Sequence, residues 1–348
     1  SAGANWKRTG IRPIKIWALT DGLAGNETQA RGLAEAVARA RSGSVDVKRV
    51  PLTKGAGRIP AVLAHRIHRV WPGWPMAGVA RDADPIAPPW PDLVIGAGRR
   101  SGPVVAALGR RQICRTVQIL DPQTRPDRFD AVIVPSHDTL RGNRVLTTLG
   151  AMNRLTPDAV ADAARCWQRP ELPGHGALIA VLIGGPSRSS RFTDEDSGRL
   201  LEALTALAQR ERLMVSVSRR TPAGLTEALR AELSGKAMVW GGPRDGPNPY
   251  PAMLGHADAI LVTEDSVNMA SEAASTGKPV SIFAIGRVAP KLASFHAALR
   301  DHGASRPFDG GVGHWTYPPL AEADRIAGLL AERRILAARP EQDTRSRS

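Results

Sequence analysis

Short apolar runs alternate with longer stretches of helical periodicity along the chain, and this alternation constrains the fold more than any other feature of the sequence. Parallel strands need a crossover connection between them, usually a helix, so the alternation predicts βαβ units and parallel sheets. The runs expected to form strands are 14–19, 45–50, 92–95, 116–120, 131–134, 178–183, 214–217, 237–240, 259–262 and 280–284. The helices expected between them include 27–40, 157–167, 194–210, 222–233 and 267–275. The predicted fold class is therefore α/β.

Chain length and one proline-rich segment predict two domains. At about 150 residues per domain, a chain of 348 residues can form two separate cores. Segment 169–176 contains two prolines and two glycines, which end the preceding helix and place a boundary near residue 170. We therefore expect doubly wound domains over 1–170 and 171–318, and a C-terminal segment over 319–348. In that segment an apolar-periodic helix crosses back toward the first domain, and a polar tail follows it.

Positive charge is concentrated in the first half of the chain. Residues 1–169 contain 26 Lys and Arg against 13 Asp and Glu, whereas the remaining residues contain 21 against 20. Such an asymmetry predicts an anionic partner for the first domain, such as acidic lipid headgroups, a phosphorylated acceptor or nucleic acid. The alternative is a solvated basic surface without a specific partner.

Two further features bear on where the protein acts. The only cysteines, Cys114 and Cys166, are too few for a disulfide framework, so a reducing cytoplasmic setting is expected. No run approaches the roughly 20 apolar residues that span a bilayer. Apolar residues recur at helical spacing over 58–74, where Trp71 and Trp74 end the stretch. This pattern predicts an interfacial helix, with a core helix as the alternative, and a protein peripheral on the inner face of the cytoplasmic membrane.

Segment 257–280 carries the strongest functional signal. A buried strand runs to Val262, a polar turn follows it, and a helix begins near Ser266 and ends before Pro279. Open parallel sheets bind ligands at the carboxyl ends of their strands, so a ligand is expected at this turn. Backbone N–H groups at the start of the helix, with the Ser266 hydroxyl, favour a phosphate. Glu272, about two turns into the helix, is suited to accept both hydroxyls of a ribose.

The order of strand, polar turn, helix with Glu272 and Gly-x-Pro resembles the donor-site motif of GT-B glycosyltransferases. The chain resembles the mitochondrial-fission "elongated mitochondria" family more closely, over segments 20–26, 98–101, 118–122, 135–138, 184–187, 218–222 and 262–266. This resemblance implies two Rossmann-like domains facing across a cleft, with a nucleotide-diphosphate sugar as substrate in the second and no cofactor. Segment 194–196 is similar to the Asp-x-Asp metal motif of other glycosyltransferases. It lies at a helix start, where acidic residues are expected electrostatically, so no metal is predicted.

Two more loops of the second domain are predicted to contact the donor. One follows strand 178–183 and begins with two glycines, whose small size allows close approach of a ligand. The other follows strand 214–217 and contains two arginines, which suit a diphosphate through charge-assisted hydrogen bonds. The expected donor-binding residues are Gly184, Gly185, Ser187, Arg188, Arg219, Arg220, Thr263, Glu264, Asp265, Ser266, Asn268, Met269 and Glu272. The alternative is a pair of ordinary βα turns with solvated arginines.

The first domain is expected to supply the acceptor side and the catalytic base. Glycosyl transfer with inversion needs a base that deprotonates the acceptor hydroxyl, and Asp21, directly after the first strand, is the candidate. Glu27, His137 and Asp138 are its reserves. The expected acceptor-side residues are Gly22, Asn26, Arg99, Arg100 and Ser101, of which the last three belong to a loop suited to an anion. The alternative role for Asp21 is that of a turn or cap residue.

These observations predict a metal-independent glycosyltransferase. It would move a sugar from a nucleotide-diphosphate donor to an anionic, lipid-linked envelope acceptor of the glycolipid or lipopolysaccharide type. An anionic membrane surface is the expected docking partner, and no nucleic-acid partner is expected. Because fold does not imply function, two alternatives stay open. One is a non-catalytic membrane-associated adaptor with a degenerate GT-B fold, and the other is a UDP-sugar epimerase.

Overall fold

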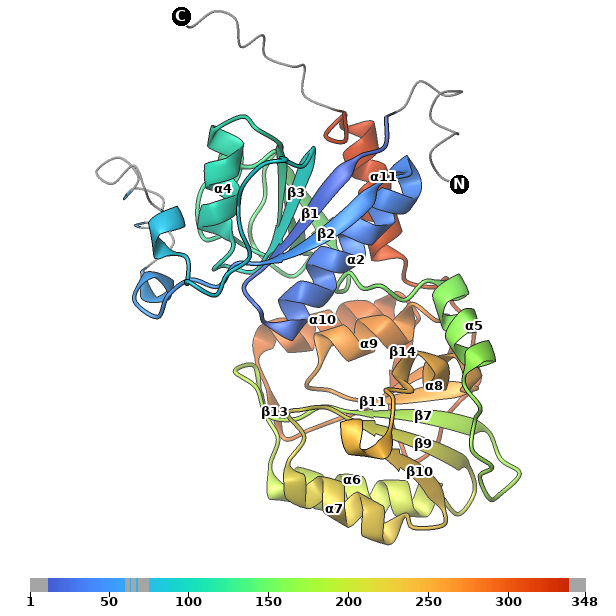
Figure 1. Ribbon diagram of the computed structural model, residues 1–348. Helices are drawn as coiled ribbons and strands as arrows, with labels where there is room; N and C mark the ends of the chain where they lie inside the picture. Colours follow the sequence, from blue (N-terminus) through green and yellow to red (C-terminus); the bar gives the residue numbers. More distant parts are fainter. Residues whose placement is uncertain (1–11, 60–62, 64–66, 68–74, 338–348) are drawn as a thin grey trace, which may run out of the picture. The chain divides into compact units, whose positions relative to one another are not determined.

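A computed structural model describes residues 12–59, 63, 67 and 75–337 of the chain, which forms two compact units (Figure 1). Unit 1 comprises the described residues up to Thr148, the short stretch Met152–Arg154, and those from Glu322 onward. Unit 2 comprises Leu149–Ala151 and Leu155–Ala321.

Unit 1 is built on a parallel six-stranded sheet in the order β2-β1-β3-β4-β5-β6. Its strands are β1 (Lys15–Thr20), β2 (Ser44–Arg49), β3 (Leu93–Ala97), β4 (Arg115–Ile119), β5 (Ala131–Pro135) and β6 (Val145–Thr148). Successive side chains of a strand point to opposite faces, so Ile16 of β1 joins one core and Trp17 the other. The first core is covered by α2 (Ala24–Arg41) and α11 (Glu322–Glu332), which lie side by side in Figure 1. Helix α4 (Gly102–Arg110) covers the second core.

Unit 2 also holds a parallel six-stranded sheet, in the order β10-β9-β7-β11-β12-β14. Its strands are β7 (Leu178–Ile183), β9 (Arg212–Val217), β10 (Ala237–Trp240), β11 (Ala259–Thr263), β12 (Val280–Phe283) and β14 (Ser305–Pro307). One face packs against α6 (Asp194–Leu207) and α7 (Ala223–Glu232), and the other against α8 (Tyr250–His256), α9 (Val267–Ala274) and α10 (Pro290–Asp301). Strands β8 (Ser190–Arg191) and β13 (Arg287–Val288) form a small antiparallel pair. The prediction of two doubly wound α/β domains is confirmed.

Each sheet has one point at which the strand order reverses. In unit 1 the chain adds β2 on one side of β1 and then β3 on the other. In unit 2 it adds β9 and β10 on one side of β7 and then β11 on the other. Open α/β sheets bind ligands outside the carboxyl ends of the strands at such a point. The topology therefore favours ligand sites after β1 and β3 in unit 1, and after β7 and β11 in unit 2.

The first boundary between the units falls earlier than residue 170, where the proline-rich segment had placed it. Helix α5 (Pro157–Cys166), predicted for the first domain, belongs to unit 2 because it packs against α8. His256 Nε2 lies 3.0 Å from the carbonyl oxygen of Ala164, and the rings of His256 and Trp167 are 5.9 Å apart. The prolines after α5 thus end a helix within unit 2 rather than separate two domains.

The predicted C-terminal helix crosses back to unit 1 as α11. Arg39 of α2 donates a hydrogen bond to Asp324 at 2.7 Å, and Arg325 donates to the carbonyl oxygen of Thr147 at 2.7 Å. The buried side chains of Ile326 and Leu330 join the core beneath α2. Helix α11 is therefore part of the first unit's core. The predicted facing of the two units across a cleft stays a prediction.

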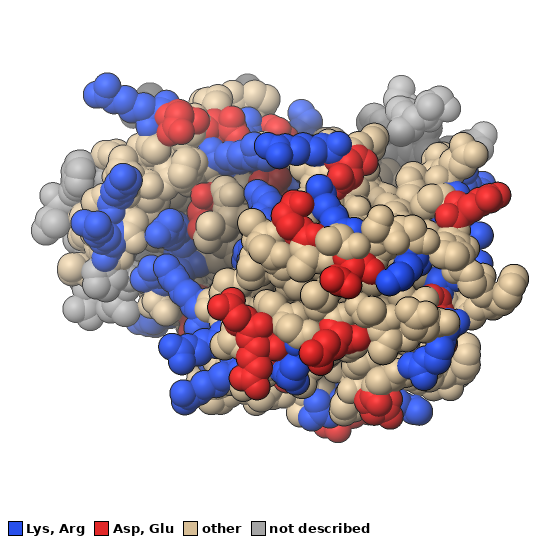
Figure 2. Space-filling view, turned by 90° about the horizontal axis from the view of Figure 1, so that it is seen from below, with Lys and Arg blue, Asp and Glu red and all other residues tan. Residues whose placement is uncertain are grey.

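The membrane predictions concern surface features. Within the described ranges, no helix combines the length and the apolar character that crossing a bilayer requires. The expected interfacial helix over 58–74 lies for the most part outside the described residues, and so do Trp71 and Trp74. Figure 2 shows Lys and Arg side chains mixed with Asp and Glu over the face that it draws. Peripheral membrane association therefore stays a prediction.

Candidate functional site

Two glycines after β7 pack directly against the loops of the neighbouring strands. The Gly184 N–H donates to Thr263 Oγ1 at 2.8 Å, and the Gly185 N–H donates to Asp265 Oδ2 at 2.9 Å. A Cβ added to Gly184 would overlap the Asp265 carboxylate, and one added to Gly185 would overlap the Arg220 carbonyl group. The two glycines are therefore required by packing between loops, whereas the sequence had suggested close approach of a ligand.

The Asp265 carboxylate joins the loops after β7, β9 and β11. Its side chain is 0% exposed and accepts hydrogen bonds from Arg220 Nη2 at 2.8 Å and Thr263 Oγ1 at 2.7 Å, besides that from Gly185. The other terminal nitrogen of Arg220 donates to the Gly185 carbonyl oxygen at 2.5 Å. A buried carboxylate needs this degree of pairing, because an uncompensated charge is costly in the interior. Asp265, predicted to bind a donor, instead lies beneath the loops and positions them together with Arg220.

Groups suited to an anion lie in the loops after β7 and β9 and at the start of α9. Arg188 and Arg219 are exposed, and neither forms an ion pair with any residue that the structure describes. Ser266 is buried and caps α9, because its Oγ accepts a hydrogen bond from the Met269 N–H at 3.3 Å. The start of α9 presents further N–H groups and the positive end of the helix dipole. Strands β9, β7 and β11 are adjacent, so these groups lie at strand ends spaced by about 4.8 Å.

Ser187 lies in a tight turn of the same edge. Its hydroxyl is 2.8 Å from that of Ser190, and it accepts a hydrogen bond from the Ser189 N–H at 3.1 Å. Ser187 itself is exposed. The turn therefore holds its hydroxyl at the surface beside Arg188, as the predicted donor loop requires.

Two of the predicted donor-binding residues point elsewhere. Glu264 Oε2 accepts a hydrogen bond from the Ile285 N–H at 3.3 Å, which directs its side chain toward the end of β12, and burial raises the pKa of Glu264. Met269 packs on the core formed with α10, and Asn268 is half-buried. The structure thus brings together Gly184, Ser187, Arg188, Arg219 and Ser266, and it does not place Glu264 or Met269 with them.

Glu272, predicted to bond a ribose, is half-buried and already accepts a hydrogen bond within the protein. The Tyr250 hydroxyl donates to Glu272 Oε2 at 2.6 Å. Burial raises the pKa of Glu272 to about 7, although this hydrogen bond acts in the opposite direction. Burial also raises the pKa of Tyr250, with a further contribution from the charge of Glu272. Tyr250 was not identified from the sequence; the available signal was that a tyrosine buried in a core needs a polar partner for its hydroxyl.

The raised pKa of Glu272 predicts a pH-dependent stability. The folded protein keeps the Glu272 proton up to about pH 7, whereas the unfolded chain releases it near 4.5. The contribution of Glu272 to the free energy of unfolding therefore falls as pH rises from about 4.5 to about 7, by on the order of 3 kcal/mol. Glu272→Gln should remove this fall, as measured by urea denaturation at about pH 5 and about pH 8. Glu195→Gln, at an exposed carboxyl, should keep it; identical pH dependence in the wild type and Glu272→Gln would contradict the assignment.

In unit 1, Asp21 lies at the point where the strand order reverses. Its Oδ1 accepts hydrogen bonds from the Leu23 N–H at 3.2 Å and from Asn26 Nδ2 at 3.1 Å. These bonds are those of a turn residue, and they orient the carboxylate at the start of α2. Oδ2 makes no hydrogen bond within the described part of the chain. Gly22 has a φ of +86°, a left-handed conformation that glycine adopts without strain.

The reserve bases are placed less favourably than Asp21. Glu27 pairs with Arg49 at 3.3 Å and with Arg31 at 3.8 Å, so its charge is already engaged. His137 follows β5, which is three strands from β1. At about 4.8 Å between strands, His137 lies roughly 14 Å from the end of β1 along the sheet edge. The structure does not bring the predicted bases together.

The predicted anion loop after β3 is only partly available. Arg99 and Arg100 are exposed. Ser101 is buried, and its hydroxyl donates to the carbonyl oxygens of Ala97 at 3.0 Å and Gly98 at 2.9 Å. Ser101 therefore closes the turn before α4 and does not face a ligand.

Comparison with known proteins gives a family and distant structural neighbours. The family described as "Mitochondrial fission ELM1" matches residues 24–334. Mitochondrial fission protein ELM1 of Arabidopsis thaliana is 31% identical over 280 residues, covering 72% of this chain and 65% of the plant protein, which is less than two thirds of its length. An uncharacterized protein of Rickettsia prowazekii (strain Madrid E) is 27% identical over 285 residues, covering 69% and 79%. Among solved structures, the glycotransferase of kitacinnamycin is similar with a TM-score of 0.48 and 13% identity, over 94% of each chain.

Proposed function

The chain belongs to the mitochondrial fission ELM1 family, and we propose that its second unit binds a nucleotide-diphosphate sugar, which the protein transfers to an anionic acceptor. One observation carries this proposal. At the reversal point of the unit 2 sheet, the buried Asp265 carboxylate and its partner Arg220 hold together three loops that also carry two exposed arginines and the start of α9. Rigid support beneath a set of exposed cationic groups is what recognition of a diphosphate requires.

Each part of the donor has a matching group in this proposal. The diphosphate oxygens accept hydrogen bonds from Arg188, Arg219 and the N–H groups at the start of α9. The ribose hydroxyls bond to Glu272, whose second carboxylate oxygen is not engaged by Tyr250. Asp21 accepts the proton of the acceptor hydroxyl through its available Oδ2. The acceptor is a phosphorylated, lipid-linked molecule, in keeping with the positive charge of residues 1–169.

A thermal-shift screen of nucleoside diphosphates and their sugars tests the binding step. A ligand at one hundred times its dissociation constant should stabilise the folded protein by about 2.7 kcal/mol. Arg219→Ala should lose most of this stabilisation, because a hydrogen bond to a charged group contributes about 1.5–3 kcal/mol. Arg169→Ala, at an exposed arginine before β7, is the matched control and should behave as the wild type. No shift with any nucleotide would refute the proposal.

A non-catalytic role is the second candidate, because the name of the plant relative describes mitochondrial fission and no reaction. The adaptor and the transferase are distinguished by whether a bound nucleotide sugar is consumed when an acceptor is added. A saturated protein that releases no nucleoside diphosphate with any phosphorylated glycolipid acceptor would favour the adaptor function. Release of free nucleoside diphosphate that depends on the acceptor would favour the transferase.

A further inference from the structure

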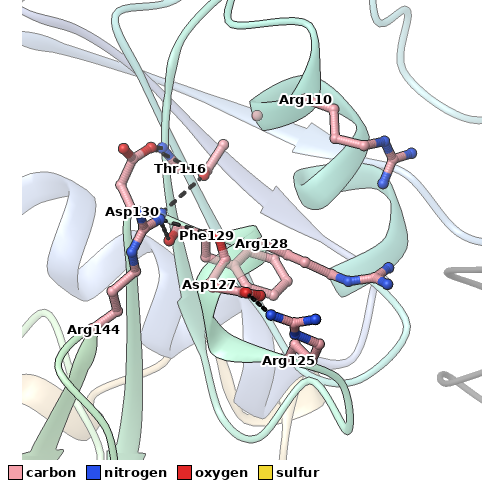
Figure 3. A pocket seen from close by; sticks show the side chains of 9 residues that line it. Arg110, Thr116, Arg125, Asp127, Arg128, Phe129, Asp130 and Arg144 are labelled. Carbon is pink, nitrogen blue, oxygen red and sulfur yellow. Dashed lines mark hydrogen bonds and ion pairs between the residues drawn. The ribbon is translucent and has the colours of Figure 1, made fainter.

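A pocket of about 410 Å³ opens at the amino end of the unit 1 sheet (Figure 3). It lies between the end of α4, the start of β4, the 3-10 turn η4 (Pro126–Arg128), and the residues that precede β5 and β6. The carboxyl ends of β1 and β3, where Asp21 and Arg99 lie, are at the opposite edge of the same sheet. The pocket is therefore distinct from the sites described above, and the inference drawn from it does not rest on the proposed function.

The lining of the pocket carries more positive than negative charge. Four arginines and two aspartates line it, namely Arg110, Arg125, Arg128, Arg144, Asp127 and Asp130. The charge of Asp130 is balanced by Arg115, which does not line the pocket and whose Nη1 lies 3.0 Å from Asp130 Oδ1. Asp130 Oδ2 accepts a hydrogen bond from the Thr116 N–H at 2.8 Å. Asp127 is paired with Arg125. The two acidic residues therefore do not balance the arginines.

The excess of positive charge affects Arg110, the last residue of α4, most directly. It forms no ion pair with any residue in the described ranges. Its pKa is lowered first by burial and then by the neighbouring charges of Arg128 and Arg111. Desolvation and like charge both disfavour a guanidinium, and an anion in the pocket would offset both. In Figure 3 the guanidinium groups of Arg110, Arg125 and Arg128 come from two separate elements and extend to the same side of the pocket.

The wall of the pocket is held in place by the remaining contacts. Arg144 donates to the carbonyl oxygen of Phe129 at 2.6 Å and to that of Asp127 at 3.1 Å, which joins the start of β6 to the η4 turn. The Phe129 side chain is buried in the core beneath α4. Arg144 and Phe129 therefore shape the pocket, while Arg110 presents its guanidinium without an ion-pair partner among the described residues.

We propose that this pocket binds a phosphate-bearing ligand, with Arg110, Arg125 and Arg128 contacting the phosphate oxygens. The planar guanidinium presents forked N–H donors that match phosphate geometry, and several of them together favour a dianion. The volume falls in the range of roughly 300–1,000 Å³ typical of small-molecule pockets and exceeds what one phosphate needs, so the phosphate is attached to an organic group. A soluble phosphomonoester and a lipid phosphomonoester headgroup share this chemistry.

Binding measurements with two matched probes test the proposal and distinguish these sources. Glycerol 3-phosphate presents the phosphomonoester in solution and is measured by calorimetry. Vesicles of phosphatidylcholine and phosphatidic acid present it at a surface and are measured by co-sedimentation, against vesicles of phosphatidylcholine alone. Arg110→Gln and Arg128→Gln should each weaken binding of the effective probe about tenfold or more. Arg81→Gln, which removes one exposed arginine of unit 1 outside the pocket, should bind as the wild type.

The results with the two probes distinguish a soluble ligand from a lipid headgroup. Loss of glycerol 3-phosphate binding in the pocket variants supports a soluble ligand, and loss of binding to phosphatidic acid vesicles alone supports a lipid headgroup. The melting temperature of each variant is compared with that of the wild type to check that the fold is kept. The proposal is overturned if the wild type binds neither probe, if both pocket variants bind as tightly as the wild type, or if Arg81→Gln weakens binding to the same extent.

Discussion

Replacing Asp265 with alanine is expected to lower the free energy of unfolding by about 1–3 kcal/mol, because it leaves buried hydrogen-bond donors without an acceptor, whereas the partly exposed Arg220 side chain can be solvated. The substitution removes the acceptor for Arg220, Thr263 and the Gly185 N–H in one step. Urea denaturation followed by circular dichroism measures the change. Nucleotide binding should be lost as well, because the loops after β7, β9 and β11 are no longer held together.

A matched aspartate in the same unit provides the control. Asp194 is exposed in the first turn of α6, where a carboxylate contributes only about 0.3–1 kcal/mol through the helix dipole. Asp194→Ala should therefore be close to the wild type in stability and should bind nucleotide normally. If Asp265→Ala is no less stable than Asp194→Ala, Asp265 is not the residue that joins the three loops.

Asp21→Asn is expected to lower the rate of sugar transfer about 10²–10⁴-fold, the usual contribution of a positioned general base. The amide keeps an oxygen that can accept from the Leu23 N–H and Asn26, so the loop should hold its shape. Donor binding and melting temperature should change little. Asp82→Asn, at an exposed aspartate of unit 1, should retain the wild-type rate. A wild-type rate in Asp21→Asn would show that the Asp21 carboxylate only caps the turn before α2.

The sequence predicted two wholly apolar strands with the bounds that the structure has, of which β7 is central in its sheet and β10 lies at the edge. Strands β7 and β10 match the predicted ranges 178–183 and 237–240 residue for residue. Helix α4 was not predicted, because Val104, Val105 and Leu108 are all buried and the stretch has no polar face to reveal its period. Strand β14 was missed because it is a short edge strand that contains a proline.

The candidate site was predictable in its position and less so in its contacts. The polar turn after β11 and the glycines after β7 follow adjacent strands, and parallel topology alone places them together. Which of the polar groups is buried depends on side-chain packing between loops distant in sequence. Asp265 and Arg220 are 45 residues apart, and no local pattern indicates that they pair. The Tyr250–Glu272 contact and the arginine pocket at the amino end of the unit 1 sheet could not be predicted for the same reason.

Hydrogen exchange of the wild-type protein with and without a saturating nucleoside diphosphate tests the central claim most directly. Bound ligand slows exchange where it bonds to backbone N–H groups or restrains the loops that contact it. We predict slower exchange in peptides covering 184–190, 218–221 and 263–269, and unchanged exchange in those covering 98–101 and 125–130. Saturation with nucleotide that leaves the three unit 2 peptides unchanged would contradict the assignment of the nucleotide site to the β7, β9 and β11 loops.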